Sequence, residues 1–83
     1  MFYNVYIIYN SKYDKFYIGQ TNNLYARIKE HNLGLSEYTS KYSGKWELKY
    51  KETYQTRSQV MKREKFLKKQ KSKEFYWKLI KKE

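Results

Sequence analysis

The amino-acid sequence predicts an α/β protein of the α+β type, with elements in the order strand, strand, helix, strand, helix, helix. Two observations carry this prediction. Runs of β-branched and aromatic residues occur near the N-terminus and again at 46–54, as is typical of strands. The segments that follow begin with Ser, Thr or Asn and space their apolar residues three or four apart, as is typical of helices.

The first two strands are predicted at 4–9 (NVYIIY) and 16–19 (FYIG), joined by the polar turn 10–15 (NSKYDK). A turn this short indicates an antiparallel hairpin. Successive side chains of a strand lie on opposite faces of its sheet. One face then holds Val5, Ile7 and Tyr9, and the other holds Tyr6 and Ile8. Within the hairpin we expect Tyr6 and Tyr17 to project toward the same side.

The first helix is predicted over 24–31 (LYARIKEH), where Leu24 and Ile28 recur at helical spacing. Three residues before it have side chains that accept hydrogen bonds from free backbone N–H groups: Thr21, Asn22 and Asn23. Gly34 suits the end of this helix, because a left-handed backbone is common there. Residues 34–45 are predicted to be a loop from their composition.

The third strand is predicted at 46–54 (WELKYKETY). Within it, Trp46, Leu48 and Tyr50 alternate with charged residues. This pattern predicts a strand with one buried side and one side that faces solvent.

Two helices are predicted after the third strand. The first runs over about 57–70, capped by Thr56 or Ser58. Ser72 then starts a final helix. In that helix Phe75, Leu79 and Ile80 have the spacing of core residues, with Tyr76 and Trp77 as partial cover.

The composition describes a small basic chain, which we expect to form a single domain, 1–83. Among 83 residues, 19 Lys and Arg face 8 Asp and Glu, a net charge of +11. Cysteine is absent, which excludes disulfides and thiolate zinc sites and fits the cytoplasm. We expect neither a membrane span nor a signal peptide. The charge indicates a polyanionic partner, with nucleic acid first, although a solvated lysine-rich surface explains it equally well.

Arg27 and His31 are four residues apart and therefore share one face of the first helix. A guanidinium that binds a phosphate beside an imidazole suits phosphoryl chemistry. The alternative is an exposed arginine and a solvated histidine. Taken alone, the pair favours that alternative.

Glu64 is more informative than this pair. On the predicted helix 57–70, three apolar residues lie within about 60° of it; these are Val60, Met61 and Leu67. A carboxylate in an apolar stripe is rare unless it is paired or binds a metal. A structural ion pair, for instance with Arg27, or a place at the edge of the stripe explains it equally well.

With Tyr6 and Tyr17 added, these residues form a set suited to hydrolysing a phosphodiester. The reaction needs a proton acceptor for water, a cation for the developing charge and help for the leaving oxygen. Phenol, imidazole, guanidinium and a divalent metal held by a carboxylate supply all three. One carboxylate indicates one metal ion, because paired metals use several acidic ligands.

Through these residues the sequence resembles the GIY-YIG endonucleases. It is most similar to their small stand-alone members, which resemble the N-terminal nuclease domain of the bacterial excision-repair incision subunit. The two motifs of the family name appear as Asn4-Val5-Tyr6 and Tyr17-Ile18-Gly19. Arg27 and the KEHN that follows it match the family's helix. KREKFLKK at 62–69 matches its late segment, whose glutamate falls on Glu64. The resemblance covers essentially the whole chain.

The resemblance implies a three-stranded antiparallel sheet flanked by helices, and cleavage of DNA that depends on one Mg²⁺ or Mn²⁺ ion. It implies that Glu64 is the only protein ligand of the metal and that Arg27 binds the phosphate. Two tyrosines would line the site, with Tyr6 favoured as the base and Tyr17 as the ligand of water or phosphate. His31 would position or assist the tyrosine that acts as base.

Four positions beside the site complete the comparison with the family. Gly19 would let the chain turn tightly next to the site. Asn4 stands where the family name has glycine, and Gln20 stands where some members have lysine. Some members also carry a late asparagine, and none follows Asn32 here. These departures leave the rate and the substrate open more than the reaction class.

The helix at 57–70 and its end carry the basic residues expected to contact nucleic acid. Together with Arg27 these are Lys62, Arg63, Lys65, Lys68, Lys69, Lys71 and Lys73. Lys68 shares the face of Glu64 and is expected to be a cation of the site, whereas a solvated surface explains most of the individual lysines. Three late aromatics are expected in the core, where they would not stack on bases: Trp46, Tyr76 and Trp77.

The favoured function is a divalent-metal-dependent DNA endonuclease, a phosphodiester hydrolase acting on single-stranded, duplex or branched DNA in repair or recombination, directed by structure or damage. One alternative is a non-catalytic nucleic-acid-binding module that retains the fold. Another is a small basic scaffold, which explains the charge but not Glu64. A surface this small leaves little room for choosing a target, so a protein partner for targeting is also expected.

Overall fold

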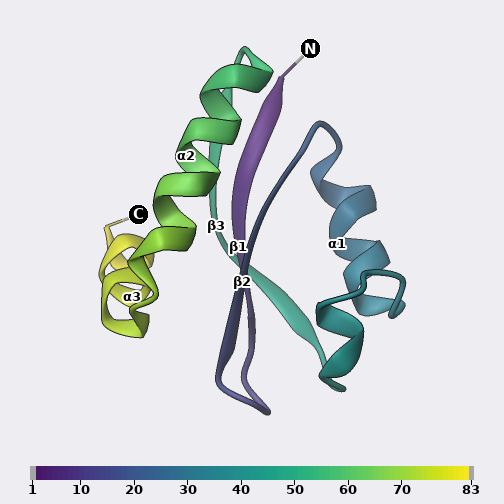
Figure 1. Cartoon of the computed structure of the whole chain (residues 1–83). Helices are drawn as coiled ribbons and strands as arrows, with labels where there is room; N and C mark the ends of the chain where they lie inside the picture. The colour runs from purple at the N-terminus through teal and green to yellow at the C-terminus, as the bar shows by residue number, and fades with distance from the viewer. Residues whose placement is uncertain (1, 83) are drawn as a thin grey trace.

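A computed structural model describes residues 2–82 and shows the predicted element order, β-β-α-β-α-α (Figure 1). The elements are β1 (Tyr3–Asn10), β2 (Lys15–Thr21), α1 (Leu24–Asn32), the 3₁₀ turn η1 (Thr39–Lys41), β3 (Trp46–Tyr54), α2 (Arg57–Gln70) and α3 (Lys73–Lys81). The third strand and the long helix have the predicted bounds. β1 and β2 extend one or two residues beyond the predicted strands.

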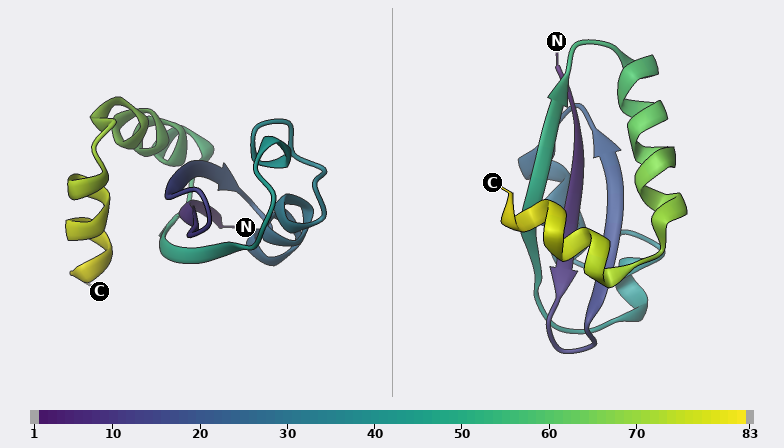
Figure 2. Two further views of the ribbon diagram at one scale, coloured as in Figure 1. Left: turned by 90° about the horizontal axis from the view of Figure 1, so that it is seen from below. Right: turned by 90° about the vertical axis from the view of Figure 1, so that its left-hand side faces the viewer.

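β1 lies at the centre of an antiparallel sheet with the strand order β2-β1-β3. This confirms the three-stranded antiparallel sheet. β2 is therefore an edge strand. The helices α2 and α3 cover one face of the sheet, and α1 with η1 lies against the other (Figures 1 and 2).

Alternation along β1 sends side chains to both faces, as predicted. Val5 and Ile7 pack into the core beneath α2 and α3, whereas Tyr6 and Ile8 pack beneath α1. All four side chains have no exposed surface. Each such burial of an apolar side chain stabilises the fold by about 1.5–3 kcal/mol.

The predicted alternation along β3 is wrong, because the strand is irregular. Ile7 pairs with Tyr50 but the next residue, Ile8, pairs with Leu48, so Lys49 is an extra residue in β3. An extra residue reverses which face the following side chains occupy. Trp46 and Tyr50 therefore lie in different cores, and Leu48 is exposed.

The helix ends follow the predicted signals. Asn23 caps α1 by accepting a hydrogen bond from the backbone N–H of Ala26. Gly34, just beyond the helix, has a φ of 77°, a left-handed conformation that glycine adopts without strain. Thr56 caps α2 in a capping box with Gln59.

The last helix packs differently from the prediction. Ser72 caps it as expected, but its buried residue is Tyr76, whose hydroxyl donates to the Leu67 carbonyl at 2.7 Å. Phe75, Leu79 and Ile80 are only partly buried. Trp46 is buried and Trp77 packs on Tyr9 and Phe16, so the expected core roles of these aromatics are confirmed.

The helices of residues 2–82 include none that is both long and apolar enough to cross a membrane.

Candidate active site

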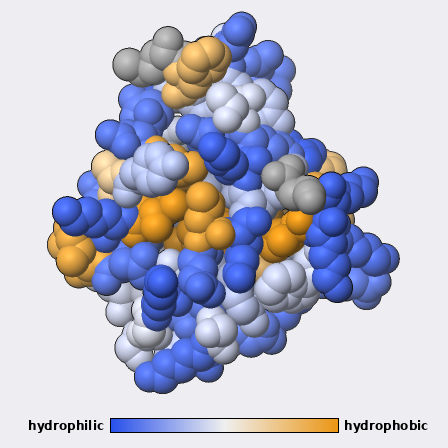
Figure 3. Space-filling view, turned by 180° about the vertical axis from the view of Figure 1, so that it is seen from behind, coloured by the Kyte–Doolittle hydropathy of each residue, from blue (hydrophilic) through white to orange (hydrophobic). Residues whose placement is uncertain are grey.

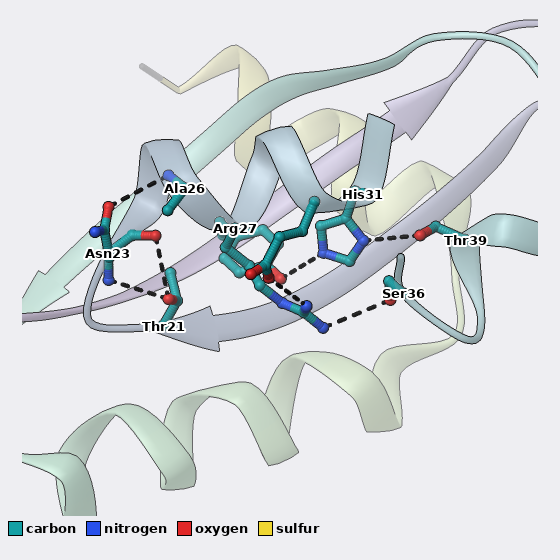
Figure 4. A network of polar contacts seen from close by, with 9 residues as sticks. Thr21, Asn23, Ala26, Arg27, His31, Ser36 and Thr39 are labelled. Atoms are coloured by element: carbon teal, nitrogen blue, oxygen red, sulfur yellow. Dashed lines mark hydrogen bonds and ion pairs between the residues drawn. The ribbon is translucent and has the colours of Figure 1, made fainter. Parts of the chain in front are cut away.

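Tyr6, His31 and Thr39 form a buried chain of hydrogen bonds beneath α1. The Tyr6 hydroxyl lies 2.8 Å from His31 Nε2, and His31 Nδ1 lies 2.8 Å from Thr39 Oγ1. The three side chains come from β1, α1 and η1 and are at most 2% exposed. Figure 4 shows the His31 ring on α1 pointing toward Thr39, with a dashed line for the bond between them. The alternative of a solvated histidine is therefore wrong.

The His31 imidazole is neutral near pH 7. Burial lowers its pKa to about 4, and the positive charge of Arg27 contributes. A neutral imidazole has one donor and one acceptor nitrogen. Either Nδ1–H donates to Thr39 while Nε2 accepts from Tyr6, or both bonds run the other way. In both arrangements one hydrogen bond, with one proton, links the Tyr6 hydroxyl to Nε2 of the imidazole.

Gly19 makes room for the Tyr6 ring. It pairs with Tyr6 across the hairpin in the middle of β2. A Cβ added to Gly19 would lie 2.6 Å from Tyr6 Cζ, closer than real contacts allow, and would crowd Tyr17 Cε2 at 3.0 Å. The expected tight turn at this glycine is wrong, because the backbone there is regular strand. The glycine lets two phenols sit side by side.

Tyr17 is the accessible phenol of the pair. Its ring centroid lies 6.4 Å from that of Tyr6 and 4.9 Å from that of His31, and a third tyrosine, Tyr38, lies 5.5 Å away. Tyr17 is partly exposed and lines two surface grooves. By contrast, Tyr6 has no exposed surface. Burial raises the pKa of the Tyr6 hydroxyl well above its ordinary value, and the neighbouring Tyr17 adds to this.

Arg27 joins this group from the first turns of α1. Its Nη1 donates to Glu30 at 2.9 Å, and Nη2 lies 3.5 Å from Ser36 Oγ (Figure 4). The Glu30 carboxylate raises the pKa of Arg27, and a contact with the Tyr6 hydroxyl contributes. The structural ion pair that was one alternative for Glu64 is present, but its partner is Lys68, whereas Arg27 pairs with Glu30. Glu30 is half-exposed, so this pair is weak enough to exchange for a phosphate.

Glu64 comes from α2, which covers the face of the sheet opposite to α1 and Tyr6. Its side chain is 21% exposed and its carboxylate lies 3.4 Å from Lys68 Nζ. That same ammonium lies 5.9 Å from the centre of the Tyr17 ring. The raised pKa of Tyr6 is due mainly to burial, and the Glu64 charge adds to it. Glu64 and Lys68 therefore face the tyrosines across the sheet edge.

The basic residues of α2 separate into three groups. Lys62, Lys65 and Lys69 are exposed. Arg63 is engaged, since its Nε and Nη2 donate to the two oxygens of Glu52 at 2.8 and 2.9 Å. Lys68 lines the larger groove beside Tyr17. Seen from behind, the surface is largely hydrophilic, and its hydrophobic side chains gather in patches across the middle of that face (Figure 3).

Several residues beside the site were not predicted from the sequence. These are Lys15, Ser36, Tyr38, Thr39 and Lys41, which line the grooves or contact His31. Most come from the stretch 34–45, predicted only as a loop. The one available signal was its run of Ser, Thr and Tyr, which supplies hydroxyl groups but gives no direction to them.

A metal at this site would depend on Glu64. Residues 2–82 contain no cluster of three or more His, Asp and Glu side chains that could hold an ion. Mg²⁺ keeps several water ligands and is commonly bound through one or two carboxylates together with substrate phosphates. Glu64 is a single, partly exposed carboxylate whose partner Lys68 lines the larger groove, and such a carboxylate fits a water-rich site.

Comparison with known proteins gives one finding. The family model for the GIY-YIG catalytic domain matches residues 2–79. No curated protein and no solved structure matches the chain.

Proposed function

The chain belongs to the GIY-YIG family of nucleases, and from this premise we propose that it is a divalent-metal-dependent DNA endonuclease that hydrolyses phosphodiester bonds. We propose that it recognises structure or damage in repair or recombination. The proposal includes a cytoplasmic location and a protein partner for targeting. One observation carries it: an accessible phenol, a guanidinium and a carboxylate face one edge of the sheet, with a neutral imidazole behind them.

Arg27 would bind the scissile phosphate. Its guanidinium lines the smaller groove together with Tyr17, so a phosphate placed there meets both side chains. Binding would exchange the Glu30 partner for phosphate oxygens. A guanidinium offers two parallel N–H donors to a phosphate and stabilises the charge that develops during hydrolysis.

The different exposure of the two phenols leads us to propose roles opposite to those favoured from the sequence. Tyr17 is open to both grooves and would contact the attacking water. Tyr6 is fully buried and would act through its neighbours, because no water can reach its hydroxyl in this arrangement. His31, bonded to Tyr6, would keep that hydroxyl fixed behind the Tyr17 ring. Tyr6 is then a positioning residue.

Glu64 would hold Mg²⁺ or Mn²⁺, which when bound supplies a Lewis acid for the phosphate and a water of lowered pKa. Lys68, at 3.4 Å from the carboxylate, would move toward substrate phosphate as the metal binds. Lys62, Lys65 and Lys69 would contribute phosphate contacts that are independent of sequence. Arg63 is left out of this contact surface, because Glu52 occupies its guanidinium.

The experiment is a cleavage assay on labelled single-stranded, duplex and branched DNA with Mg²⁺, with Mn²⁺ and with chelator. Glu64→Ala and Arg27→Ala should each lower the cleavage rate by about 100-fold or more. Glu74→Ala is the matched control, because Glu74 is an exposed acid paired with a lysine four residues later, and it should cleave normally. Salt-sensitive DNA binding should persist in all variants.

Binding of every substrate without cleavage would instead support the alternative, a non-catalytic nucleic-acid-binding module. The basic grooves alone would account for that result. Cleavage that survives Glu64→Ala would contradict the assigned metal ligand.

A further inference from the structure

Two grooves meet at the site and share the same two tyrosines. The larger has a volume of about 610 Å³ and is lined by Tyr17 and Tyr38 with four lysines, Lys15, Lys68, Lys71 and Lys73. The smaller, of about 330 Å³, is lined by Tyr17 and Tyr38 with Arg27, Ser36, Glu37 and Lys41. We call them the lysine groove and the arginine groove. Each holds more basic than acidic side chains.

Tyr38 stands where the two grooves meet. Its ring is 5.5 Å from Tyr17 and 5.6 Å from Tyr42 between centroids. It is 38% exposed, so part of the ring is open to a ligand. The ring packs beside Tyr17, the phenol proposed to contact water.

The position of Tyr38 is fixed by the site itself. The next residue, Thr39, bonds the buried His31, and the Tyr38 carbonyl accepts from the backbone N–H of Lys41 at 3.2 Å. The ring is therefore held on a short 3₁₀ turn anchored to the hydrogen-bond chain of the site. A rigidly held aromatic loses little conformational freedom when a base stacks on it.

We propose that Tyr38 stacks on an unpaired base next to the scissile phosphate, while the lysine and arginine grooves hold the backbone on either side. This inference rests on the proposed nuclease function and specifies its substrate: a strand whose bases are unpaired at the cleavage point. Bases can stack on a protein ring only where they are not paired and stacked in a duplex. A ring that divides two basic grooves fits a strand with splayed bases.

The charges of the two grooves support a phosphate backbone as the occupant. Lys15, Lys68 and Lys71 surround one side of the ring, and Arg27 and Lys41 the other. Four acids oppose them: Glu37 lines the arginine groove, Glu30 pairs with Arg27, Glu64 pairs with Lys68, and Asp14 pairs with Lys73 at 2.7 Å. The balance stays positive in the lysine groove, and it becomes positive in the arginine groove once Arg27 exchanges Glu30 for a phosphate. Such contacts bind phosphates without reading sequence.

The test measures binding in chelator, so that no cleavage interferes. Fluorescence anisotropy would follow a single-stranded oligonucleotide, a splayed-arm duplex and a fully paired duplex. Tyr38→Leu should weaken binding of the first two about tenfold, because losing one base–aromatic stack has an effect of this size. Duplex binding should change about twofold or less. Tyr38→Phe keeps the ring and should bind like the parent.

Tyr25→Leu is the matched control. Tyr25 is 83% exposed on α1 and lines neither groove, so its loss should leave all three affinities unchanged. An equal loss on duplex and single strand, or no loss at all, would overturn the stacking role of Tyr38.

A second measurement uses the parent chain and does not depend on how the variant folds. A 2-aminopurine at the first unpaired nucleotide of the splayed arm should change its fluorescence on binding, whereas one in the paired region should not. No difference between the two positions would overturn the inference. If the chain prefers unpaired strands but no metal supports cleavage, the stacking inference stands and the nuclease function fails. If the chain cleaves DNA but shows no preference for unpaired strands, the nuclease function stands and the stacking inference fails.

Discussion

The two faces of the sheet are built from neighbouring residues of β1 but are stabilised in different ways. Ile7 lies in an apolar core with Val60 and Leu67 of α2. Tyr6, one residue earlier, lies under α1 and bonds the buried His31. Apolar packing tolerates changes that keep volume and shape, whereas a buried hydrogen-bond chain loses much of its value when one member is removed. The polar face is therefore the less tolerant of the two.

The two faces also have different roles, one in the stability of the fold and the other in the chemistry of the site. The apolar face holds α2 against the sheet, so that Glu64 and Lys68 are carried to the edge at β2. The polar face supplies Tyr17, Arg27 and the imidazole. Changes on the first face should act mainly on unfolding, and changes on the second mainly on cleavage.

The largest effect is expected from Tyr17→Phe on the polar face. If this hydroxyl contacts the attacking water, its loss should lower the cleavage rate about 10²–10⁴-fold, the usual size of an acid–base contribution. Stability should hardly change, because the Tyr17 ring is retained. Single-turnover cleavage with saturating metal is the measurement.

Tyr6→Phe is the matching change at the buried phenol and is compared with Tyr17→Phe. A positioning role predicts a smaller loss of cleavage, about tenfold, since the hydroxyl's contacts with His31 and Arg27 are removed but no contact with the attacking water is. A greater loss for Tyr6→Phe than for Tyr17→Phe would return the base to Tyr6, as favoured from the sequence.

The next effect is expected from Ile7→Ala on the apolar face. Truncating this fully buried side chain should lower the free energy of unfolding by about 3 kcal/mol, because a cavity is left in the core. Urea unfolding followed by tryptophan fluorescence gives the value. The folded fraction should cleave within about twofold of the parent rate. Ile7→Val, which removes one methyl group, should be destabilised by only about 1 kcal/mol.

The third prediction separates the faces by pH. The pKa of His31 is lowered to about 4 in the folded protein from about 6.5 in an unfolded chain. As the pH falls below 6.5 the unfolded state therefore takes up the proton first. The contribution of His31 to the free energy of unfolding should be fully present above pH 6.5, and the free energy should fall by about 3 kcal/mol toward pH 4. His31→Gln should flatten this dependence, as measured by urea unfolding from pH 4 to 8.

Ile7→Val is the control for the pH experiment. A change on the apolar face should lower stability by the same amount at every pH, because no proton is involved. A pH dependence that is unchanged in His31→Gln would mean that another group is responsible. Asp14 and Glu52 are two such groups, because ionic and hydrogen-bonded partners lower their pKa values. Burial opposes this lowering for Glu52. Both carboxyl groups affect stability mainly below pH 4.

Local signals made most of the fold predictable. The caps Asn23, Thr56 and Ser72 and the left-handed Gly34 lie where the sequence places them, because a cap depends on residues only a few positions apart. The two faces of β1 follow from alternation alone. The irregular pairing of β3 did not follow, since register is a property of two strands and is invisible within either one.

The candidate site was predictable as a set of residues but not as an arrangement. Tyr6, Tyr17, Arg27 and His31 share motifs and spacing that mark them in the sequence, and the structure brings them together. The engagement of Arg63 by Glu52 and the place of Tyr38 between two grooves involve segments far apart in the chain. No local pattern encodes such contacts.

The sequence by itself determined the element types, their ends, the basic charge and the family's characteristic residues, because propensity, capping and alternation act over a few positions. Only the tertiary structure decided that Tyr6 is buried and Tyr17 partly exposed. It also decided that Gly19 provides space for the Tyr6 ring where a turn was expected, and that His31 is buried and neutral. Exposure and pKa depend on what the folded chain places around a group, and for these side chains the neighbours come from η1, α1 and α2.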